Sequence, residues 1–483
     1  MYENLLAGVS TDLWIGGAWR KASDGQRFDV IDPATENTIT SVASATVDDA
    51  SAAIDAASDA FPAWAAKKPR ERGEILRKAF ELMVRDGERI ARLMTLENGK
   101  SLADSRAEVA YAAEFFRWNA EEAVRNLGQL YNAPASGART LVHHRPAGIA
   151  VLVTPWNFPA AMATRKIGPA LAAGCTMVLK PASDTPLTML ALMPILQEAG
   201  VPAGVVNVIP SRSSGKVVSA MLHDPRVRVI SFTGSTEVGR KLLHEAADNI
   251  IKPAMELGGN APFIVFDDAD IDAAVEGAML AKMRNMGEAC TAANRFLVHD
   301  KVHDEFSQKL AAKMKALKMG NGLDDGVAVG PLINPEGRDK VVALVDDAVK
   351  KGAKVLTGGK LPAGKGYFYP PTVLVDVPDN ADCVDEEIFG PVAAIQRFTS
   401  EEEAIRRANA TIYGLVAYLY TRDLARGMRV SEQLECGMVG LNRGLVSDPS
   451  APFGGMKQSG LGREGGHEGL MEFLQTQYIS TNW

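Results

Sequence analysis

Two segments of the chain carry the residue types that covalent acyl chemistry needs. Cys290 lies in Asn285-Met-Gly-Glu-Ala-Cys-Thr-Ala-Ala-Asn-Arg295, where small neighbours leave room for a carbonyl group to approach the sulfur. Glu256 is a lone carboxylate just before the glycine pair Gly258-Gly259. A thiol nucleophile and a separate general base are the groups that form and hydrolyse a thioester. If the two segments meet in space, the sequence predicts an enzyme that passes through a thioester.

Two strand-to-helix turns have the character of dinucleotide-binding segments. The first runs through Gly234, Ser235 and Gly239, and a glycine turn at a helix N-terminus presents N–H groups that suit a pyrophosphate. It lacks the usual G-x-G-x-x-G spacing, so a plain turn stays an alternative. Lys180 ends an apolar strand before a turn with hydroxyls, among them Ser183, which suits ribose or phosphate oxygens. A merely solvated lysine is the alternative there.

The segments that must position these residues alternate between short apolar strands and helices. We expect strands at 150–154, 176–180, 205–209, 227–232, 261–266, 373–375 and 392–398. We expect helices near 187–199, 271–284 and 302–317, and long alanine-rich helical patterns over 47–96 and 107–127. Segments 140–145 and 476–482 have the pattern of edge or bridging strands. Strands that alternate with helices are typical of a parallel sheet, so the predicted fold class is α/β.

Composition excludes several classes of protein. The chain has 483 residues, too many for one hydrophobic core, and its formal net charge of -7 argues against a general nucleic-acid or membrane surface. No apolar run is long enough to span a bilayer, and no secretory signal is recognisable. The four cysteines are scattered without zinc-type spacing, so we expect no metal site and a reduced, cytoplasmic protein.

Seven motifs, taken in order along essentially the whole chain, resemble those of the aldehyde dehydrogenase superfamily. They are Thr154-Pro-Trp-Asn-Phe-Pro159, Leu179-Lys-Pro-Ala182, Phe232-Thr-Gly-Ser235, Glu256-Leu-Gly-Gly259, Gly287-Glu-Ala-Cys290, Glu387-Ile-Phe-Gly-Pro391 and Pro452-Phe-Gly-Gly455. Any one of them can arise by chance, and their common order carries the resemblance.

The resemblance implies a role for each matching residue. Cys290 is similar to the family's nucleophile, Glu256 to its general base, and Asn157 to the side-chain half of its oxyanion hole, with the Cys290 N–H as the other half. The implied coenzyme-binding residues are Thr154, Trp156, Lys180, Ser183, Gly234, Ser235, Glu387 and Phe389. Among these, Lys180 would contact the adenosine ribose, Ser235 the pyrophosphate and Glu387 the nicotinamide ribose. Trp156 would pack near the pyrophosphate and Phe389 near the nicotinamide.

Each of these residues also has an ordinary structural interpretation. A cysteine among small residues is usually a packed core thiol. Glu256 could be a turn residue, Asn157 a helix cap, and Glu387 a solvated charge in the patch Asp385-Glu-Glu387.

The resemblance also implies a domain organisation. A Rossmann-type dinucleotide-binding domain would comprise 1–127 and 147–258, with 452–469 returning to it, and an α/β catalytic domain would comprise 259–451. A small β oligomerisation element would be formed by 128–146 and 470–483. Exposed strand edges favour pairing with a sister chain, so we expect a homodimer or homotetramer.

A narrower resemblance is to the succinate-semialdehyde dehydrogenases. In that subfamily the positions of Arg165 and Arg284 bind the substrate's distal carboxylate, and that of Ser447 contacts the substrate. An arginine fork suits a carboxylate because it donates two parallel hydrogen bonds. Pairing of both arginines with structural carboxylates is the alternative. Glutarate semialdehyde, one carbon longer, presents the same groups, so the substrate stays open between the two.

Three positions bear on departures from the family and on coenzyme choice. Ala292 replaces a second cysteine found in some members, so no redox-switch disulfide is expected, and Arg443 adds positive charge where a threonine is common. Ser183 stands where NAD-preferring relatives often have a glutamate, whose charge would repel a 2′-phosphate, so we expect NADP to be used at least as well as NAD.

Three alternative functions remain. They are oxidation of another aldehyde, a coenzyme A-dependent variant, which Glu256 argues against, and a non-catalytic protein of this fold.

Overall fold

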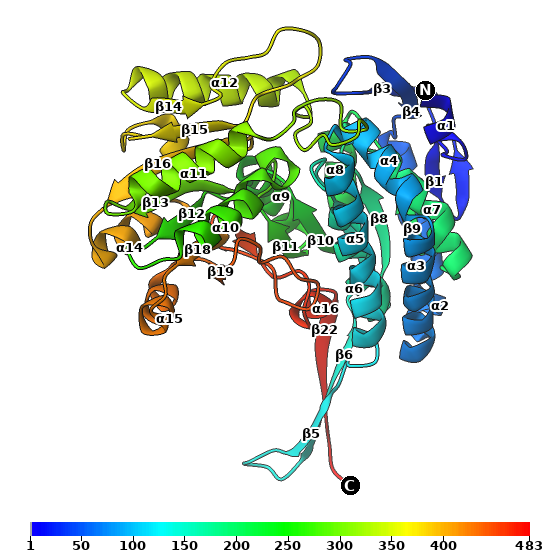
Figure 1. The fold of residues 1–483 in the computed structure, drawn as a ribbon. Helices are drawn as coiled ribbons and strands as arrows, with labels where there is room; N and C mark the ends of the chain where they lie inside the picture. Colours follow the sequence, from blue (N-terminus) through cyan, green and yellow to red (C-terminus); the bar gives the residue numbers. More distant parts are fainter. Residues whose placement is uncertain (1) are drawn as a thin grey trace.

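The computed structural model describes residues 2–483 and places two α/β units side by side, with a narrow β arm projecting from one end (Figure 1). A short helix, α1 (Tyr2–Leu6), and the antiparallel pair β3 (Arg27–Ile31) and β4 (Thr38–Ala43) lie at the opposite end. Within the described residues, no helix has both the length and the apolar character that a membrane crossing requires.

The first unit is built on an eight-stranded sheet in the order β2-β1-β9-β8-β7-β10-β11-β21. Its five central strands, β9, β8, β7, β10 and β11, are parallel, and β1 and β21 join them antiparallel. The strands are β1 (Leu13–Ile15), β2 (Ala18–Arg20), β7 (Ile149–Val153), β8 (Thr176–Lys180), β9 (Val206–Val208), β10 (Val227–Thr233), β11 (Lys252–Glu256) and β21 (Gly460–Leu461). The helices are α2 (Val47–Ala66), α3 (Pro69–Arg85), α4 (Gly87–Asn98), α5 (Leu102–Glu122), α6 (Ala161–Ala173), α7 (Leu187–Ala199), α8 (Ser214–Leu222), α9 (Thr236–Asp248) and α16 (Glu468–Met471).

Both faces of this sheet are buried, as the continuous apolar pattern of its strands requires. Ala150 and Leu152 of β7 pack into the core shared with α3 to α7, whereas Val151 and Val153 pack into the core shared with α2, α8 and α9. This alternation is the period of two that a strand imposes on its side chains.

The path of the chain through the sheet creates a ligand-binding edge. From β7 the chain builds outward through β8 to β9, then returns to add β10 on the other side of β7. The strand order therefore reverses between β7 and β10, and open α/β sheets bind ligands at the carboxyl ends of strands at such a point. The segments that leave β7 and β10 there begin with Thr154 and Gly234.

The second unit is a seven-stranded sheet in the order β14-β15-β16-β13-β12-β18-β19, parallel except for β14. The strands are β12 (Ala261–Val265), β13 (Ala293–His299), β14 (Lys354–Thr357), β15 (Thr372–Val375), β16 (Val392–Phe398), β18 (Val416–Tyr420) and β19 (Met438–Leu441). The helices are α10 (Ile271–Met283), the 3-10 turn Arg284–Gly287, α11 (His303–Lys315), α12 (Pro335–Lys350), α13 (Asp382–Asp385), α14 (Glu401–Asn409) and α15 (Leu424–Gln433). The short pair β17 (Tyr413–Gly414) and β20 (Met456–Lys457) links this unit to the segment returning to the first sheet.

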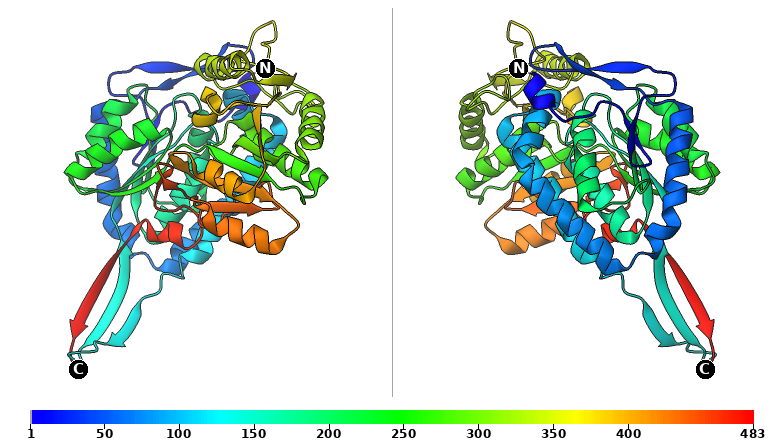
Figure 2. Two further views of the ribbon diagram at one scale, coloured as in Figure 1. Left: turned by 90° about the vertical axis from the view of Figure 1, so that its left-hand side faces the viewer. Right: turned by 90° about the vertical axis from the view of Figure 1, so that its right-hand side faces the viewer.

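The projecting arm is a three-stranded antiparallel sheet in the order β22-β6-β5, and both views in Figure 2 show it standing clear of the two units. It comprises β5 (Gln129–Asn132), β6 (Arg139–Pro146) and β22 (Leu474–Thr481), and β22 pairs with β6 along its whole length. Leu130, Tyr478 and Ile479 on it are exposed. The exposed apolar side chains and open edges suit pairing with another chain, and the predicted domain boundaries and oligomeric state remain predictions.

The long helical pattern expected over 47–96 is divided into three helices, because the sequence contains stop and start signals inside it. Pro69 begins α3 after two extended residues, and Gly87 begins α4. The helix expected over 107–127 is α5, which begins five residues earlier at Leu102, since the Ser101 side chain accepts the Asp104 N–H and caps it.

Candidate active site

A cleft of about 260 Å³ lies where the carboxyl ends of β7, β10 and β11 meet the loop before β13. Seven of the residues singled out from sequence lie on its wall: Trp156, Asn157, Gly234, Ser235, Cys290, Glu387 and Phe389. The cleft therefore brings together segments that are more than two hundred residues apart in the chain, from both sheets.

Cys290 is half-buried on this wall, while Cys175 and Cys383 are buried elsewhere. Burial raises the pKa of the Cys290 thiol to about 12, against the opposing charge of Arg165. The nearby carboxyl of Glu256 raises this pKa further. The sulfur is therefore a thiol at neutral pH in the free protein, and its proton has to leave before the sulfur can attack a carbonyl carbon.

Glu256 ends β11 and is buried, and its Oε2 has no hydrogen-bond partner among the described residues. Burial, and then the charge of Glu464, raise its pKa well above the usual range of a carboxyl, whereas Arg165 and Lys166 oppose the rise. An unpartnered carboxyl with a raised pKa has the properties of a general base, because its carboxylate binds a proton more tightly than an exposed one does. A Cβ on Gly454 would lie 2.8 Å from the backbone oxygen of Gly462 and 2.9 Å from Glu256 Oε1, so glycine leaves room beside this carboxyl.

Asn157 is buried, lines the same cleft as Cys290 and precedes α6 in the chain. Its Nδ2 donates to Glu288 O at 3.0 Å, which uses one of the two amide N–H bonds and leaves the other for a ligand. Asn157 does not cap α6, because the cap position is Ala160 and has no side-chain hydrogen bond. The alternative of a helix-capping role for this side chain is therefore wrong.

Polar and aromatic groups on the wall fit a dinucleotide. Ser235 caps α9, a helix of 13 residues, and a Cβ on Gly234 would lie 2.5 Å from Phe232 Cζ, so a side chain at 234 would have to displace that ring. The buried hydroxyl of Thr233 has no hydrogen-bond partner among the described residues. A helix N-terminus beside a glycine turn and an unpartnered hydroxyl suit a pyrophosphate.

The other end of the cleft suits a ribose and a planar ring. Glu387 Oε1 accepts the Gly259 N–H at 3.2 Å, and burial raises the pKa of this carboxyl to about 7. Glu387 is therefore not the solvated surface charge of the alternative interpretation. The rings of Trp156 and Phe389 meet edge to face, with centroids 5.5 Å apart. Phe389 has a left-handed φ of 55°, a conformation that a bulky residue adopts only where its surroundings impose it.

Lys180, Ser183 and Thr154 do not line the cleft but lie beside it, at the ends of the neighbouring strands β7 and β8. The Thr154 N–H donates to Lys180 O at 3.2 Å, which joins the two strand ends. Lys180 is buried, and burial lowers the pKa of its ammonium group to about 8, which Asp184 opposes. Ser183 is half-buried in the turn that follows.

Arg284 and Ser447 come together beside Phe158, the residue that follows Asn157. Arg284 Nη1 lies 3.5 Å from Ser447 Oγ, and its guanidinium stacks 4.7 Å from the centre of the Phe158 ring. No carboxylate pairs with Arg284 within the part of the chain that the structure describes, so the structural alternative does not hold for this arginine. Tyr111 lies against it at 5.5 Å.

Arg165 is fully buried and has one carboxylate partner. Its Nε lies 2.5 Å from Glu464 Oε2, and Lys166 contacts the other oxygen of the same carboxylate. Its Nη1 has only the weak acceptor Met162 Sδ at 3.7 Å, and its Nη2 has no hydrogen-bond partner among the described residues. The ion pair with Glu464 therefore engages one edge of the guanidinium, and Nη2 at its other end is left without a hydrogen-bond partner among the described residues.

Three groups near the site were not found from the sequence. Tyr111 is close enough to both arginines for their charges to oppose the rise in its pKa that burial causes. It follows a helical pattern in α5 that is typical of a core aromatic. Glu464 lies in a glycine-rich return segment, and Lys100 in a helix-to-helix turn, and nothing local marks either as buried.

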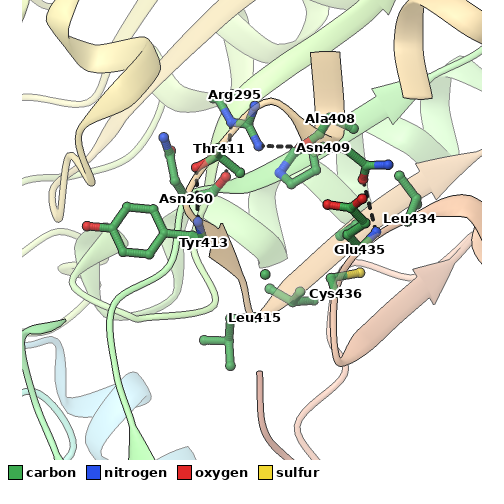
Figure 3. Close-up of a pocket in the computed structure, with 14 residues that line it drawn as sticks. Asn260, Arg295, Ala408, Asn409, Thr411, Tyr413, Leu415, Leu434, Glu435 and Cys436 are labelled. Atoms are coloured by element: carbon green, nitrogen blue, oxygen red, sulfur yellow. Dashed lines mark hydrogen bonds between the residues drawn. The ribbon is translucent and has the colours of Figure 1, made fainter. Parts of the chain in front are cut away.

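A second hollow lies behind the glycine turn, between Asn260 and the segment 408–417 (Figure 3). Arg295 spans it, donating to Asn260 O at 3.0 Å and Ala408 O at 2.9 Å. The hollow measures about 10 Å³, the room that one water occupies, so it has no space for a substrate.

Comparison with known proteins agrees with this geometry. The model of the family described as "Aldehyde dehydrogenase family" matches residues 19–479. A succinate-semialdehyde dehydrogenase of Paenarthrobacter nicotinovorans is 57% identical over 91% of this chain and 98% of its own length. A glutarate-semialdehyde dehydrogenase of Pseudomonas putida is 51% identical over 96% of each chain. A crystal structure of an Escherichia coli NADP-dependent enzyme superposes with a TM-score of 0.97 at 50% identity, covering 100% of this chain and 99% of the other.

Proposed function

The chain belongs to the aldehyde dehydrogenase family, and we propose that it oxidises succinate semialdehyde to succinate with a nicotinamide dinucleotide. One observation carries the substrate assignment: Arg284, which lies beside Ser447, and the unpartnered Nη2 end of Arg165 form a cationic group around Tyr111, and the charge of Arg165 also acts on Cys290. A carboxylate at one end of a short aldehyde would bind this group while its carbonyl carbon lies at the sulfur.

The first half of the reaction forms a thioester on Cys290. After the thiol proton has passed to solvent, the sulfur attacks the aldehyde carbon, and the carbonyl oxygen becomes an oxyanion held by Asn157 Nδ2 and the Cys290 N–H. When bound, the oxidised nicotinamide supplies the hydride acceptor. Loss of the aldehyde hydrogen as hydride restores the C=O bond, so the substrate carbon is oxidised and stays joined to sulfur as a thioester.

The second half hydrolyses that thioester. Glu256 takes a proton from a water molecule, the resulting hydroxide attacks the thioester carbon, and the C–S bond breaks. The products are the carboxylic acid and the free Cys290 sulfur, and the proton is released from Glu256 to solvent. The raised pKa of the Glu256 carboxyl supports this role, because the carboxylate is a stronger base than an exposed one.

Replacing Arg284 with alanine is expected to raise KM for succinate semialdehyde by about 10- to 100-fold, the worth of a charge-assisted hydrogen bond to a carboxylate. Steady-state rates with a neutral aldehyde of similar length should change little, because that aldehyde makes no such bond. Arg406→Ala, on the exposed face of α14, is the matched control. Equal losses on both aldehydes in Arg284→Ala would sink the carboxylate assignment.

Glutarate semialdehyde is the second candidate substrate, because a relative with that name is 51% identical. Its extra carbon lengthens the span between aldehyde and carboxylate, while the chemistry at both ends is unchanged. The ratio of kcat/KM for the two semialdehydes decides between them, and we expect the four-carbon substrate to be preferred.

We further propose that NADP is used at least as well as NAD. Ser183 is neutral and lies three residues after Lys180, so no carboxylate at this turn position repels a 2′-phosphate. Ser183→Glu is expected to weaken NADP binding by about tenfold or more through charge repulsion and to leave NAD binding intact. Titration of coenzyme fluorescence measures both affinities without turnover. A strong preference of the parent protein for NAD would contradict the proposal.

A further inference from the structure

A fully buried ion pair lies behind the proposed oxyanion hole. Lys100 follows the end of α4, and its Nζ lies 2.6 Å from Oε2 of Glu108 on α5, with both side chains 0% exposed. Removing two charges from water costs several kcal/mol for each ion, and their attraction offsets this only if further hydrogen bonds satisfy both groups. The remaining contacts of the pair therefore show what it holds.

Both members of the ion pair form hydrogen bonds with the backbone of the loop that carries Asn157. Lys100 Nζ also donates to the backbone oxygen of Asn157 at 2.6 Å. Glu108 Oε1 accepts the backbone N–H groups of Ala160 at 2.9 Å and Ala161 at 3.1 Å, at the start of α6. One buried ion pair thus fixes the oxyanion residue and the first turn of the helix that follows it.

The ammonium group of Lys100 has a contact for each of its three N–H bonds. Glu108 and the Asn157 carbonyl take two, and the face of the Phe158 ring, 4.3 Å away, lies against the group. The guanidinium of Arg284 also lies against the Phe158 ring, 4.7 Å from its centre. A lysine in this position is therefore fully satisfied by the loop that it supports, and it cannot reach a substrate.

The turn that carries Lys100 is itself held from both units. Asn98 Nδ2 donates to Trp156 O at 3.0 Å, and the Leu102 N–H donates to Gly322 O at 3.0 Å in the second unit. A Cβ on Gly322 would collide with Lys100 O, so the backbones touch there. The turn that carries Lys100 therefore contacts both the loop that contains Asn157 and the second unit.

We propose that Lys100, held by Glu108, is the positioning residue of the oxyanion hole. The proposal rests on the proposed function, in which Asn157 Nδ2 binds the oxyanion. The direction of that amide depends on where the Asn157 backbone lies. The Asn157 backbone oxygen accepts hydrogen bonds from Lys100 Nζ at 2.6 Å and from Asn285 Nδ2 at 2.9 Å, and the one from Lys100 is the shorter. Lys100 acts through Asn157 and touches neither substrate nor coenzyme.

The test compares single and double variants by single-turnover kinetics of hydride transfer. Lys100→Met is expected to slow the rate constant by about 100-fold, the effect of misplacing a catalytic group by about 1 Å. Asn157→Ala removes the amide itself. If Lys100 acts only through that amide, the double variant Lys100→Met/Asn157→Ala is no slower than Asn157→Ala alone. Multiplication of the two effects in the double variant would overturn the proposal.

A matched control separates positioning from loss of stability. Arg72 is another buried cation that donates to backbone oxygens, including Ala172 O at 3.1 Å, at the far end of α6. Arg72→Met is expected to lower the melting temperature and to leave the hydride-transfer rate constant per active site unchanged. A Lys100→Met protein that behaves the same way would show a structural role only and overturn the proposal.

A second variant covers the case in which Lys100→Met does not fold. Glu108→Gln keeps an oxygen for the Ala160 and Ala161 N–H groups but removes the charge that holds Lys100. We expect a slower hydride transfer that disappears when Asn157→Ala is already present, and an unchanged rate would overturn the proposal. The aldehyde in every assay is one that the parent protein oxidises, so failure with succinate semialdehyde would count against the proposed function alone.

Discussion

Replacing Cys290 with alanine abolishes formation of the reduced coenzyme from succinate semialdehyde, a loss of at least about 10⁴-fold in turnover, because no other group can hold the acyl carbon. The expected loss is chemical and not structural, since the sulfur is half-buried on the cleft wall and makes no hydrogen bond within the described part of the chain. Steady-state absorbance of the reduced coenzyme measures the effect. Coenzyme binding, followed by fluorescence, should stay within about twofold of the parent protein because the coenzyme-binding wall is intact.

Cys436→Ala is the matched control for this variant. Its sulfur is also partly buried, but it lies at the small hollow behind β12 and contacts Met438 O. Full activity in Cys436→Ala together with none in Cys290→Ala supports the nucleophile assignment. Substantial turnover in Cys290→Ala would exclude a thioester on that residue.

Replacing Glu256 with glutamine separates the two halves of the reaction. We expect one equivalent of reduced coenzyme per active site to form rapidly, followed by turnover slowed by about 10²- to 10⁴-fold, the usual worth of a general base. Glutamine keeps the shape of the side chain but cannot take a proton from water, so the thioester accumulates. Rapid-mixing absorbance resolves the burst from the slow phase.

The same carboxyl predicts how hydrolysis depends on pH. Burial and Glu464 raise the pKa of Glu256, and the base works only in its deprotonated form. Thioester hydrolysis should therefore rise with pH through that raised pKa and fall as the pH drops below it, over a range above that of an exposed carboxyl. In Glu256→Gln this rising limb should be absent. A limb that persists in the variant would assign the titration to a group other than Glu256.

Much of the site follows from sequence because its residues stand at strand ends. Lys180 ends β8, Glu256 ends β11, and Gly234 follows β10, and a parallel sheet brings such ends to one edge. Cys290 was found differently, from its small neighbours and the motif that contains it. The helix over 47–96 shows the limit of the same approach, since helical periodicity alone does not reveal breaks at Pro69 and Gly87.

The buried charged residues that support the site could not be predicted, because their partners meet them only in the folded protein. Glu108 and Glu464 have the sequence surroundings of solvated carboxylates, yet both are buried beside lysines. Lys100 meets Asn157 across 57 residues, and Lys166 meets Glu464 across 298. Periodicity and local turn chemistry extend over a few residues only, so they contain no information on such partners.

Capture of the covalent intermediate tests the central claim most directly. The parent protein is mixed with succinate semialdehyde and NADP, quenched rapidly with acid, digested and examined by mass spectrometry of its cysteine peptides. We predict a mass increase of one succinyl group on the peptide that contains Cys290 and none on those that contain Cys175, Cys383 or Cys436. Reduced coenzyme formed without any acyl adduct, or with the adduct on another cysteine, would contradict oxidation through a Cys290 thioester.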